Sequence, residues 1–329
     1  MATIAHLIHQ WVDLFGAYVK LFVLAIRCRI SEQPRRLVVV TLTEHIGDII
    51  ACEPVARHVR KEEPHALLVW IVRSEYREIV ELYPAIDYVL KIYCLTTWIS
   101  LRKSRFIDRR VDLHINGRVC PVCRVPLRNN DGEQGIGLNN YFEFGSLLGS
   151  FSRAAGLPEL DDQPRLQLPR TISDDISALD LVTGYIVVHC RSNEPCKDWS
   201  PVRWNDMLDR LQALYSLTVI EIGLESQLRR AESKGYRNLC GRLSILQTAE
   251  VIHRAILFVG VDSGPAHLAN AVGTPGVVLL GGYRSFKRYN PFTGAYRSGD
   301  LAELIYSDGS VNMIEVDSVQ KAIERRLAR

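Results

Sequence analysis

The stretch Leu37-Val38-Val39-Val40-Thr41-Leu42, followed by Thr43-Glu44-His45-Ile46-Gly47-Asp48, decides the fold class of this chain. Residues 37–42 are almost wholly apolar and predict a strand that is buried on both faces. Gly47 lets the backbone turn tightly, and the residues after it follow a helical pattern. A buried strand, a turn and a helix in this order predict a parallel sheet covered by helices.

The same alternation recurs and predicts two α/β domains. Further strands are predicted at 67–72, 88–92, 111–115, 185–190, 217–222, 256–260 and 277–280. The segment 158–169 is rich in proline and acidic residues and is the expected linker between the domains. A length of 329 residues also exceeds the ~100–200 typical of one domain. We therefore expect an N-terminal segment at 1–36, a domain at 37–170 and a domain at 171–329, with loops at the strand ends facing a cleft.

Composition excludes several classes of protein. With 47% hydrophobic and 23% charged residues, the chain is neither disordered nor collagen-like nor a coiled coil. A net charge of +3 gives no reason to expect nucleic-acid binding. The 8 cysteines follow no regular framework, which predicts free thiols in a reducing compartment. No basic region precedes the first apolar stretch, so no signal peptide is expected and the predicted location is the cytoplasm.

The first 36 residues form an unusual segment. Residues 11–26 are largely apolar, but Asp13 and Lys20 leave no uncharged run near the ~20 residues of a membrane-spanning helix. Asp13, Lys20 and Arg27 recur at helical spacing and form a narrow polar stripe, and further arginines follow. Such a helix suits the inner face of an anionic membrane, as a peripheral contact. The alternative is a helix that docks on its own domain or on a second subunit.

Asp48 is the first candidate for chemistry. It lies in the predicted first helical turn after the first strand, at the ligand-binding end of a parallel sheet. A carboxylate there can act as a general base. Taken alone, the position favours a carboxylate that caps the helix and complements its dipole.

Two segments of the second domain carry the other candidates. Ser200-Pro201 is a helix-start signature, so Lys197 should lie just outside that helix, free of the core, as a phosphate ligand or a solvated surface lysine. Residues 260–267, Gly-Val-Asp-Ser-Gly-Pro-Ala-His, follow a strand and precede a helix. The exposed amides of that helix start predict an anion site, whereas the alternative is a turn capped by Asp262 or Ser263.

The order of these segments resembles the inverting heptosyltransferase-like glycosyltransferases of family nine. The resemblance spans about residues 37–285 and is carried by Ile46-Gly47-Asp48, Lys197-Asp198-Trp199-Ser200-Pro201, Gly223-Leu224-Glu225, residues 238–244 (Asn-Leu-Cys-Gly-Arg-Leu-Ser), residues 262–269 (Asp-Ser-Gly-Pro-Ala-His-Leu-Ala) and Gly273-Thr274-Pro275. It implies a GT-B fold with two Rossmann-like domains, an acceptor domain at 37–170 and a nucleotide-sugar donor domain at 171–329. One departure is Leu42, where the family commonly has an arginine.

The resemblance also implies roles for single residues. Asp48 would be the general base for the acceptor hydroxyl, Lys197 would contact the donor phosphate or sugar, and Glu225 would hold the nucleoside ribose. Asp262, Ser263, Gly264 and His267 would line the donor site. The implied partners are a nucleotide-diphosphate sugar, with an ADP-linked heptose expected, and a saccharide or lipopolysaccharide-type acceptor. No cofactor is expected.

The residue types agree with an inverting transfer that needs no catalytic metal. A base is required on one side of the anomeric carbon, and positive charge must stabilise the departing diphosphate on the other. A lysine and a helix N-terminus can supply that charge. The alternatives are a donor with another base, such as a GDP- or UDP-sugar, and a non-catalytic nucleotide-sugar binding protein. No GxGxxG follows a predicted strand, which disfavours a dinucleotide-dependent oxidoreductase.

The loop at 117–138 contains two further features. Cys120-Pro121-Val122-Cys123 is half of a zinc site, and His114 and Cys94 are the nearby residues that could add ligands. Eight lysines or arginines lie between Arg102 and Arg128, against two acids. Such a run is usually a solvated face, but it would also suit a phosphorylated acceptor.

Overall fold

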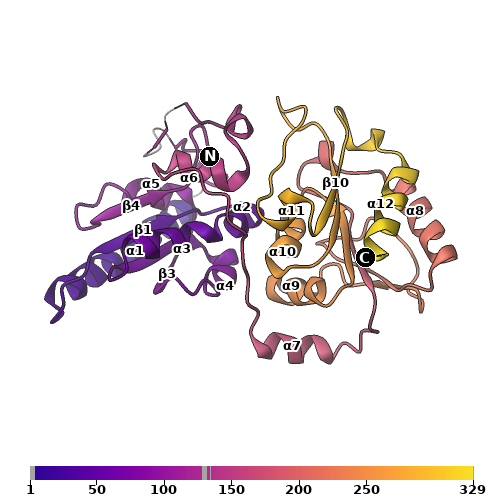
Figure 1. Ribbon diagram of the computed structural model, residues 1–329. Helices are drawn as coiled ribbons and strands as arrows, with labels where there is room; N and C mark the ends of the chain where they lie inside the picture. The colour runs from indigo at the N-terminus through magenta and orange to yellow at the C-terminus, as the bar shows by residue number, and fades with distance from the viewer. Residues whose placement is uncertain (1–3, 128–131, 134, 329) are drawn as a thin grey trace. The chain divides into compact units, whose positions relative to one another are not determined.

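The computed structural model describes residues 4–127, 132–133 and 135–328. The chain consists of two compact units, which meet in sequence at Asp161 and Asp162, within the segment expected to link two domains. Both are α/β units with a parallel sheet, as predicted from the sequence (Figure 1).

The first unit contains a four-stranded sheet in the order β3-β2-β1-β4. Its strands are β1 (Leu37–Thr41), β2 (Leu67–Arg73), β3 (Tyr88–Ile92) and β4 (Arg109–Asp112), and all neighbours are parallel. Every residue of the central strand β1 is buried, which explains its uniformly apolar sequence. Its carboxyl end is followed directly by the segment that contains Asp48.

Helices cover both faces of this sheet. Helices α1 (Ile4–Ile30) and α5 (Leu95–Leu101) pack on the face that Val39, Val69 and Ile71 share. Trp70 alternates with these residues along β2 and contacts Tyr83, whose hydroxyl donates to the Ile49 carbonyl of α2 (Ile46–Ala51). The remaining helices of the unit are α3 (Glu53–Glu62), α4 (Arg77–Val80) and α6 (Leu147–Ala154), with short 3₁₀ turns at Ser74–Tyr76 and Tyr141–Phe144.

The second unit contains a six-stranded parallel sheet in the order β10-β9-β8-β5-β6-β7. Its strands are β5 (Ile186–His189), β6 (Val219–Glu221), β7 (Tyr236–Asn238), β8 (Leu257–Val261), β9 (Gly276–Leu280) and β10 (Ala302–Tyr306). The central strands β5, β8 and β9 are buried along their whole length. Their neighbouring carboxyl ends bring the loops after β5 and β8 together.

Figure 1 shows helices on both sides of the second sheet, with α8 and α12 on one side and α9 and α10 on the other. The helices of this unit are α7 (Arg170–Ser177), α8 (Pro201–Leu214), α9 (Ile245–His253), α10 (Gly264–Val272), α11 (Ala295–Ser298) and α12 (Val316–Leu327), with 3₁₀ turns at Pro195–Lys197 and Val311–Met313. The predicted start of α8 is confirmed, because Ser200 Oγ accepts the Arg203 amide and Pro201 is the first helical residue.

The N-terminal helix α1 docks on its own unit through one face. Ala17, Leu21 and Ala25 are buried in the core, and the Asp13 carboxylate accepts hydrogen bonds from Tyr93 N and Thr97 Oγ1. The opposite face is exposed and almost entirely apolar: Ile8, Trp11, Val12, Phe15, Tyr18, Val19, Phe22, Val23, Ile26 and Ile30. The apolar sequence therefore forms two faces rather than one. Among the residues that the structure describes, no helix is both long and apolar enough to cross a membrane.

Several predicted elements differ in detail from the observed ones. Strand β4 begins two residues earlier than the predicted 111–115. Gly145, which has a φ of 121°, separates the 3₁₀ turn at Tyr141–Phe144 from α6. Ser146 then caps α6 by accepting the Gly149 amide. Strands β7 and β10 were not predicted. Both lie at sheet edges and mix polar with apolar residues, so they lack the continuous apolar run that marks a buried strand.

Candidate functional site

Asp48 lies in the first turn of α2, directly after the loop that follows β1. Its Oδ2 accepts a hydrogen bond from Arg118 Nη2 at 2.9 Å, and both side chains are largely buried. His45 occupies the N-cap position of α2, without a side-chain cap bond. The structure therefore contradicts the interpretation of Asp48 as the helix cap, because its carboxylate pairs with an arginine of the 117–138 loop instead.

A buried network joins the ends of β1 and β4 next to this segment. His114 Nδ1 lies 2.7 Å from Asp112 Oδ1, and His114 Nε2 accepts the Thr43 amide at 3.0 Å. Burial by itself would raise the pKa of Asp112, but hydrogen bonding and charge from His114, together with Arg102 and Trp98, lower it below its ordinary value. Because both ring nitrogens of His114 are engaged, it orders the strand ends rather than offering a free ligand.

Some of the basic residues between Arg102 and Arg128 form ion pairs within the first unit. Arg102 pairs with Asp112, Arg109 with Glu62, and Arg118 with Asp48. Arg128, which ends the basic run, lies outside the described residues. Lys103, Arg105, Arg110 and Arg124 are exposed. The run is thus partly a set of internal ion pairs and only partly a solvated face.

Lys197 and Asp262 form a buried ion pair at the carboxyl end of the second sheet. Lys197 ends the short turn after β5, and Asp262 directly follows β8, the neighbouring strand. Lys197 Nζ donates to Asp262 Oδ2 at 2.7 Å, and the side chains are 14% and 6% exposed. This contradicts the expectation that Lys197 projects free of the core.

Two tyrosines complete this cluster. Tyr289 Oη donates to the same Asp262 oxygen at 2.7 Å, and Lys197 Nζ lies 4.0 Å from the centroid of the Tyr283 ring. Burial by itself would raise the pKa of Asp262, but the charges of Lys197 and His267 and the hydrogen bonds from Lys197 and Tyr289 lower it. The carboxylate is therefore ionised at neutral pH and holds the ammonium in one position.

The start of α10 lies beside this cluster. Ser263 is its N-cap by backbone geometry, but its side chain makes no cap bond, and Oγ donates to the Val261 carbonyl and lies 2.9 Å from His189 Nδ1. The alternative of a turn capped by a side chain is therefore not observed at this helix start among the described residues. His267 Nε2 lies 4.0 Å from Asp262 Oδ1, and its ring packs on Phe292. Gly264, the first helical residue, has no side chain to cover the helix start.

Glu225 is separate from these contacts. Its side chain is 76% exposed and pairs with Arg191 Nη1 at 3.0 Å. The loop that carries it is shaped by the buried Glu221, which accepts hydrogen bonds from the Ser226 hydroxyl, the Gln227 amide and the Tyr236 hydroxyl. The buried acid thus fixes the loop while the exposed acid is presented to solvent.

The structure brings four predicted residues together in the second unit: Lys197, Asp262, Ser263 and His267. Sequence reasoning missed Tyr283, Tyr289 and His189 there, and Arg118 in the first unit. His189 is the last residue of β5 and the second-to-last of the predicted strand 185–190, so its position near a strand end was a usable signal. The tyrosines and Arg118 come from irregular loops, where no periodicity marks them.

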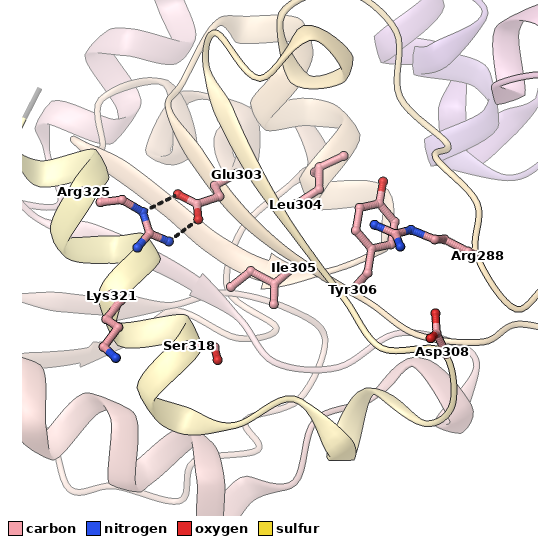
Figure 2. Close-up of a pocket in the computed structure, with 9 residues that line it drawn as sticks. All are labelled: Arg288, Glu303, Leu304, Ile305, Tyr306, Asp308, Ser318, Lys321 and Arg325. Atoms are coloured by element: carbon pink, nitrogen blue, oxygen red, sulfur yellow. Dashed lines mark hydrogen bonds and ion pairs between the residues drawn. The ribbon is translucent and has the colours of Figure 1, made fainter.

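A separate hollow of about 480 Å³ lies between β10 and α12. Figure 2 shows Arg325 paired with Glu303 on one side and Arg288 stacked over the Tyr306 ring on the other. None of the predicted site residues lines it. The Lys197–Asp262 cluster therefore remains the candidate site, because it contains the residues that the sequence predicted.

Comparisons with known proteins agree with this arrangement. Residues 148–297 match the sequence model of glycosyltransferase family 9 (heptosyltransferase). Lipopolysaccharide heptosyltransferase 3 of Escherichia coli K12 is 29% identical over 115 residues, which are 32% of this chain and 33% of that protein. The matched part is thus about a third of the length of this curated relative.

Solved structures share the fold over nearly the whole chain. A family 9 glycosyltransferase from Veillonella parvula superposes with a TM-score of 0.64 at 17% identity, covering 89% of this chain and 97% of that one. ADP-heptose lps heptosyltransferase II of E. coli gives 0.63 at 16% identity, covering 89% and 98%.

Two parallel-sheet units, with the candidate ion pair at the strand ends of the second, define a GT-B protein. Residues 148–297, which include most of the second unit, are similar to glycosyltransferase family 9. The predicted fold class is confirmed, and the predicted resemblance to this family is found in that part of the chain.

Proposed function

We propose that this protein transfers a sugar from a nucleotide-diphosphate donor to a saccharide or lipopolysaccharide-type acceptor with inversion at the anomeric carbon. The observation that carries the proposal is the buried Lys197–Asp262 pair beside the open start of α10, within the region that matches the family. An ADP-linked heptose is the proposed donor, because the similar solved structure from E. coli is described as an ADP-heptose enzyme.

In the donor half, Lys197 and the first turn of α10 would stabilise the leaving diphosphate. Asp262 and Tyr283 hold the ammonium in place, so little reorganisation is needed when negative charge develops. A unit charge at 4 Å and an effective dielectric of 20 contributes about 4 kcal/mol before desolvation. A contribution of this size supports a transfer that uses no catalytic metal. Glu225 would bond the ribose, and Ser263, Gly264 and His267 would line the donor site.

In the acceptor half, Asp48 would act as the base. Arg118 occupies Oδ2, whereas Oδ1 accepts no hydrogen bond from the described residues. Oδ1 would take the proton of the acceptor hydroxyl as its oxygen attacks the anomeric carbon. The bond from that carbon to the diphosphate then breaks, and the electron pair leaves with the phosphate oxygen. Arg118 fixes the orientation of the carboxylate during this step.

The exposed face of α1 supports a second element of the proposal, peripheral binding to an anionic membrane surface. Ten large apolar side chains are exposed along this face, and Tyr18 and Phe22 continue it onto Phe106 of the neighbouring loop. Lys20 and Arg27 on the helix, and Lys103 and Arg105 around Phe106, are exposed beside it. Apolar residues flanked by cations favour the headgroup region of anionic lipids. A membrane-bound glycolipid would then be the natural acceptor.

The donor test is a thermal-shift measurement of the full chain with ADP, GDP, UDP and their sugar conjugates. Stabilisation by ADP and ADP-heptose alone would support the proposed donor, whereas stabilisation by GDP or UDP would select the alternative base. Transfer followed by proton NMR then reports the anomeric configuration of the product. Donor binding without transfer or hydrolysis for any acceptor would favour the non-catalytic binding protein.

The membrane test uses charge substitutions rather than deletion, because Ala17, Leu21 and Ala25 belong to the core and truncation would expose it. Phe15→Glu and Phe22→Glu should abolish co-sedimentation with anionic vesicles, while Val202→Glu, at an exposed apolar residue of the second unit, should not. Equal sedimentation of all variants would contradict the membrane proposal and favour a face that contacts protein.

A further inference from the structure

Three cysteines of the first unit converge in space. Cys94 lies two residues after the end of β3 and is the N-cap residue of α5. Cys120 and Cys123 belong to the loop after β4. Their sulfur atoms all lie within 4.8 Å of one another, and Cys94 Sγ is 3.6 Å from Cys123 Sγ. Cys94 and Cys120 are buried and Cys123 is half-buried. Cys94 and His114 were the residues predicted to add metal ligands to Cys120 and Cys123. In the structure, Cys94 is the one that lies beside them.

The distances suit a shared metal ion better than a disulfide. Two sulfurs at about 2.3 Å from a tetrahedral zinc ion lie about 3.8 Å apart, close to the separation of Cys94 and Cys123. A disulfide requires about 2.05 Å between the sulfurs. The three thiols therefore stand near the positions that a tetrahedral ion would impose, without movement of the backbone.

The turn at Cys120–Arg124 is built to support a thiolate. The Cys123 amide donates to Cys120 Sγ at 3.4 Å, and the Arg124 amide donates to the Cys120 carbonyl at 2.9 Å. Arg124 has a φ of 60°, a left-handed conformation that is unfavourable for a non-glycine residue. The chain adopts it directly after the second cysteine, where it closes the turn around the sulfur. Amide donors of this kind orient and stabilise metal-bound ligands.

Thr96 also supports the Cys120 sulfur. Its side chain and its backbone both hydrogen-bond to that sulfur, as donors that favour a thiolate. His114 does not supply a fourth ligand, since both of its ring nitrogens are engaged elsewhere.

We propose that Cys94, Cys120 and Cys123 bind one zinc ion as a structural three-thiolate site, with a water molecule in the fourth position. Binding releases one proton from each thiol to solvent, so three thiolates and one divalent cation leave a local charge of −1. The metal would join the end of β3 to the loop after β4. That loop also contains Arg118, two residues before Cys120, so the site would hold in place the cation that pairs with Asp48.

The decisive experiment is metal analysis of the full chain, purified under reducing conditions without chelator. We expect about one zinc per chain in the wild type and less than a tenth of that in Cys120→Ala/Cys123→Ala. Cys196→Ala, at an exposed cysteine outside the cluster, is the matched control and should keep the full amount. Iron at the same stoichiometry and with the same dependence on the cysteines would support the site and change the ion.

The wild-type protein keeps the test valid if the double variant does not fold. Chelator-treated, reduced wild type is titrated with Co²⁺, and a sulfur-to-cobalt charge-transfer band should appear and saturate at one equivalent. Alkylation followed by peptide mapping should find Cys94, Cys120 and Cys123 protected until chelator is added. A folded, reduced wild type that binds neither zinc, iron nor cobalt would overturn the proposal, as would full metal content in the double variant.

The link to Arg118 rests on the proposed function, whereas the metal site does not. If metal binds at full stoichiometry but no nucleotide sugar is bound or transferred, the proposed function fails and the metal site stands. If transfer proceeds in a protein that binds no metal, the metal site fails and the proposed function stands. Partial loss of transfer on chelation, reversed by zinc, is expected when both hold.

Discussion

The two units hold their candidate residues in different ways. In the second unit, Lys197 and Asp262 are buried, hydrogen-bonded to each other and surrounded by tyrosines. In the first unit, the Asp48 carboxylate is hydrogen-bonded to Arg118 alone among the described side chains, and its Oδ1 accepts no hydrogen bond from them. The second unit, the proposed donor half, is thus organised around a fixed pair of charges, whereas Asp48 of the first unit keeps one carboxylate oxygen without a hydrogen bond from the described residues.

The sequence match to the family is concentrated in the second unit. The family match covers residues 148–297 and so includes most of the second unit. The apolar face of α1, the three-cysteine cluster and the Asp48–Arg118 pair all lie in the first unit, before that region.

Asp48→Asn should give the largest effect on transfer. The substitution keeps size and polarity and removes basicity, so turnover should fall roughly 10²–10⁴-fold with donor affinity nearly unchanged. Turnover and donor titration measure the two quantities separately. Glu78→Gln, at an exposed acid of α4, is the matched control and should leave both unchanged. If Asp48→Asn keeps full turnover, Asp48 serves only as the ion-pair partner of Arg118, and another residue must be the base.

The Lys197–Asp262 pair should give the next largest effect, on both stability and donor binding. Removing one partner of a buried pair costs roughly 3–5 kcal/mol, so Lys197→Met and Asp262→Asn should each lower the melting temperature on the order of 10 °C. Donor affinity should fall in both variants. Differential scanning calorimetry and nucleotide titration are the measurements.

The double variant Lys197→Met/Asp262→Asn separates the structural role from the functional one. Because no uncompensated charge remains buried, it should recover much of the stability that each single variant loses. Donor binding should stay weak, since the cation is gone. If donor affinity recovers together with stability, the pair serves only folding. The fixed charges of the second unit would then have no role in donor binding.

The sequence was sufficient for the elements whose residues are uniformly buried. Strands β1, β5, β8 and β9 were predicted because central parallel strands are apolar on both faces. The candidate residues at the ends of these strands followed from that prediction. Strands β7 and β10 were not predicted, because both are edge strands that contain polar as well as apolar residues.

The contacts between candidate residues could not be predicted from the sequence. Lys197 and Asp262 are 65 residues apart, and they meet because β5 and β8 are neighbours in the sheet. Arg118 and Tyr289 lie in loops whose course depends on tertiary packing. The apolar segment of α1 was taken as one broad face, but close packing against α5 divides it into a buried and an exposed face.

A pH-dependent loss of stability should follow from His189 in the second unit. Burial lowers the pKa of His189 to about 4, so the unfolded chain binds the extra proton between about pH 6.5 and pH 4 and the folded unit does not. Stability should therefore fall by about 3 kcal/mol as the pH decreases through this window. Asp262 and Asp112 add losses only at lower pH, because their folded pKa values lie below the ordinary range.

Thermal unfolding between pH 7 and pH 4 tests this dependence. His189→Gln should flatten the profile, even if the variant is less stable at every pH. His65→Gln, at an exposed histidine of the first unit, should leave the profile unchanged. A variant profile that retains the full slope would assign the proton uptake to another group.

Glu225→Gln should give the smallest effect and tests whether the exposed acid belongs to the donor half. Its ion pair with Arg191 is solvent-accessible, so stability should change by less than about 1 kcal/mol. A hydrogen bond from a ribose hydroxyl to a carboxylate in this setting should contribute about 1.4 kcal/mol, so the donor dissociation constant should rise about tenfold, with turnover at saturation unchanged. Asp209→Asn breaks a comparable exposed pair with Arg230 and should not alter donor binding. Unchanged donor affinity in Glu225→Gln would restrict the donor site to the buried cluster around Lys197 and Asp262.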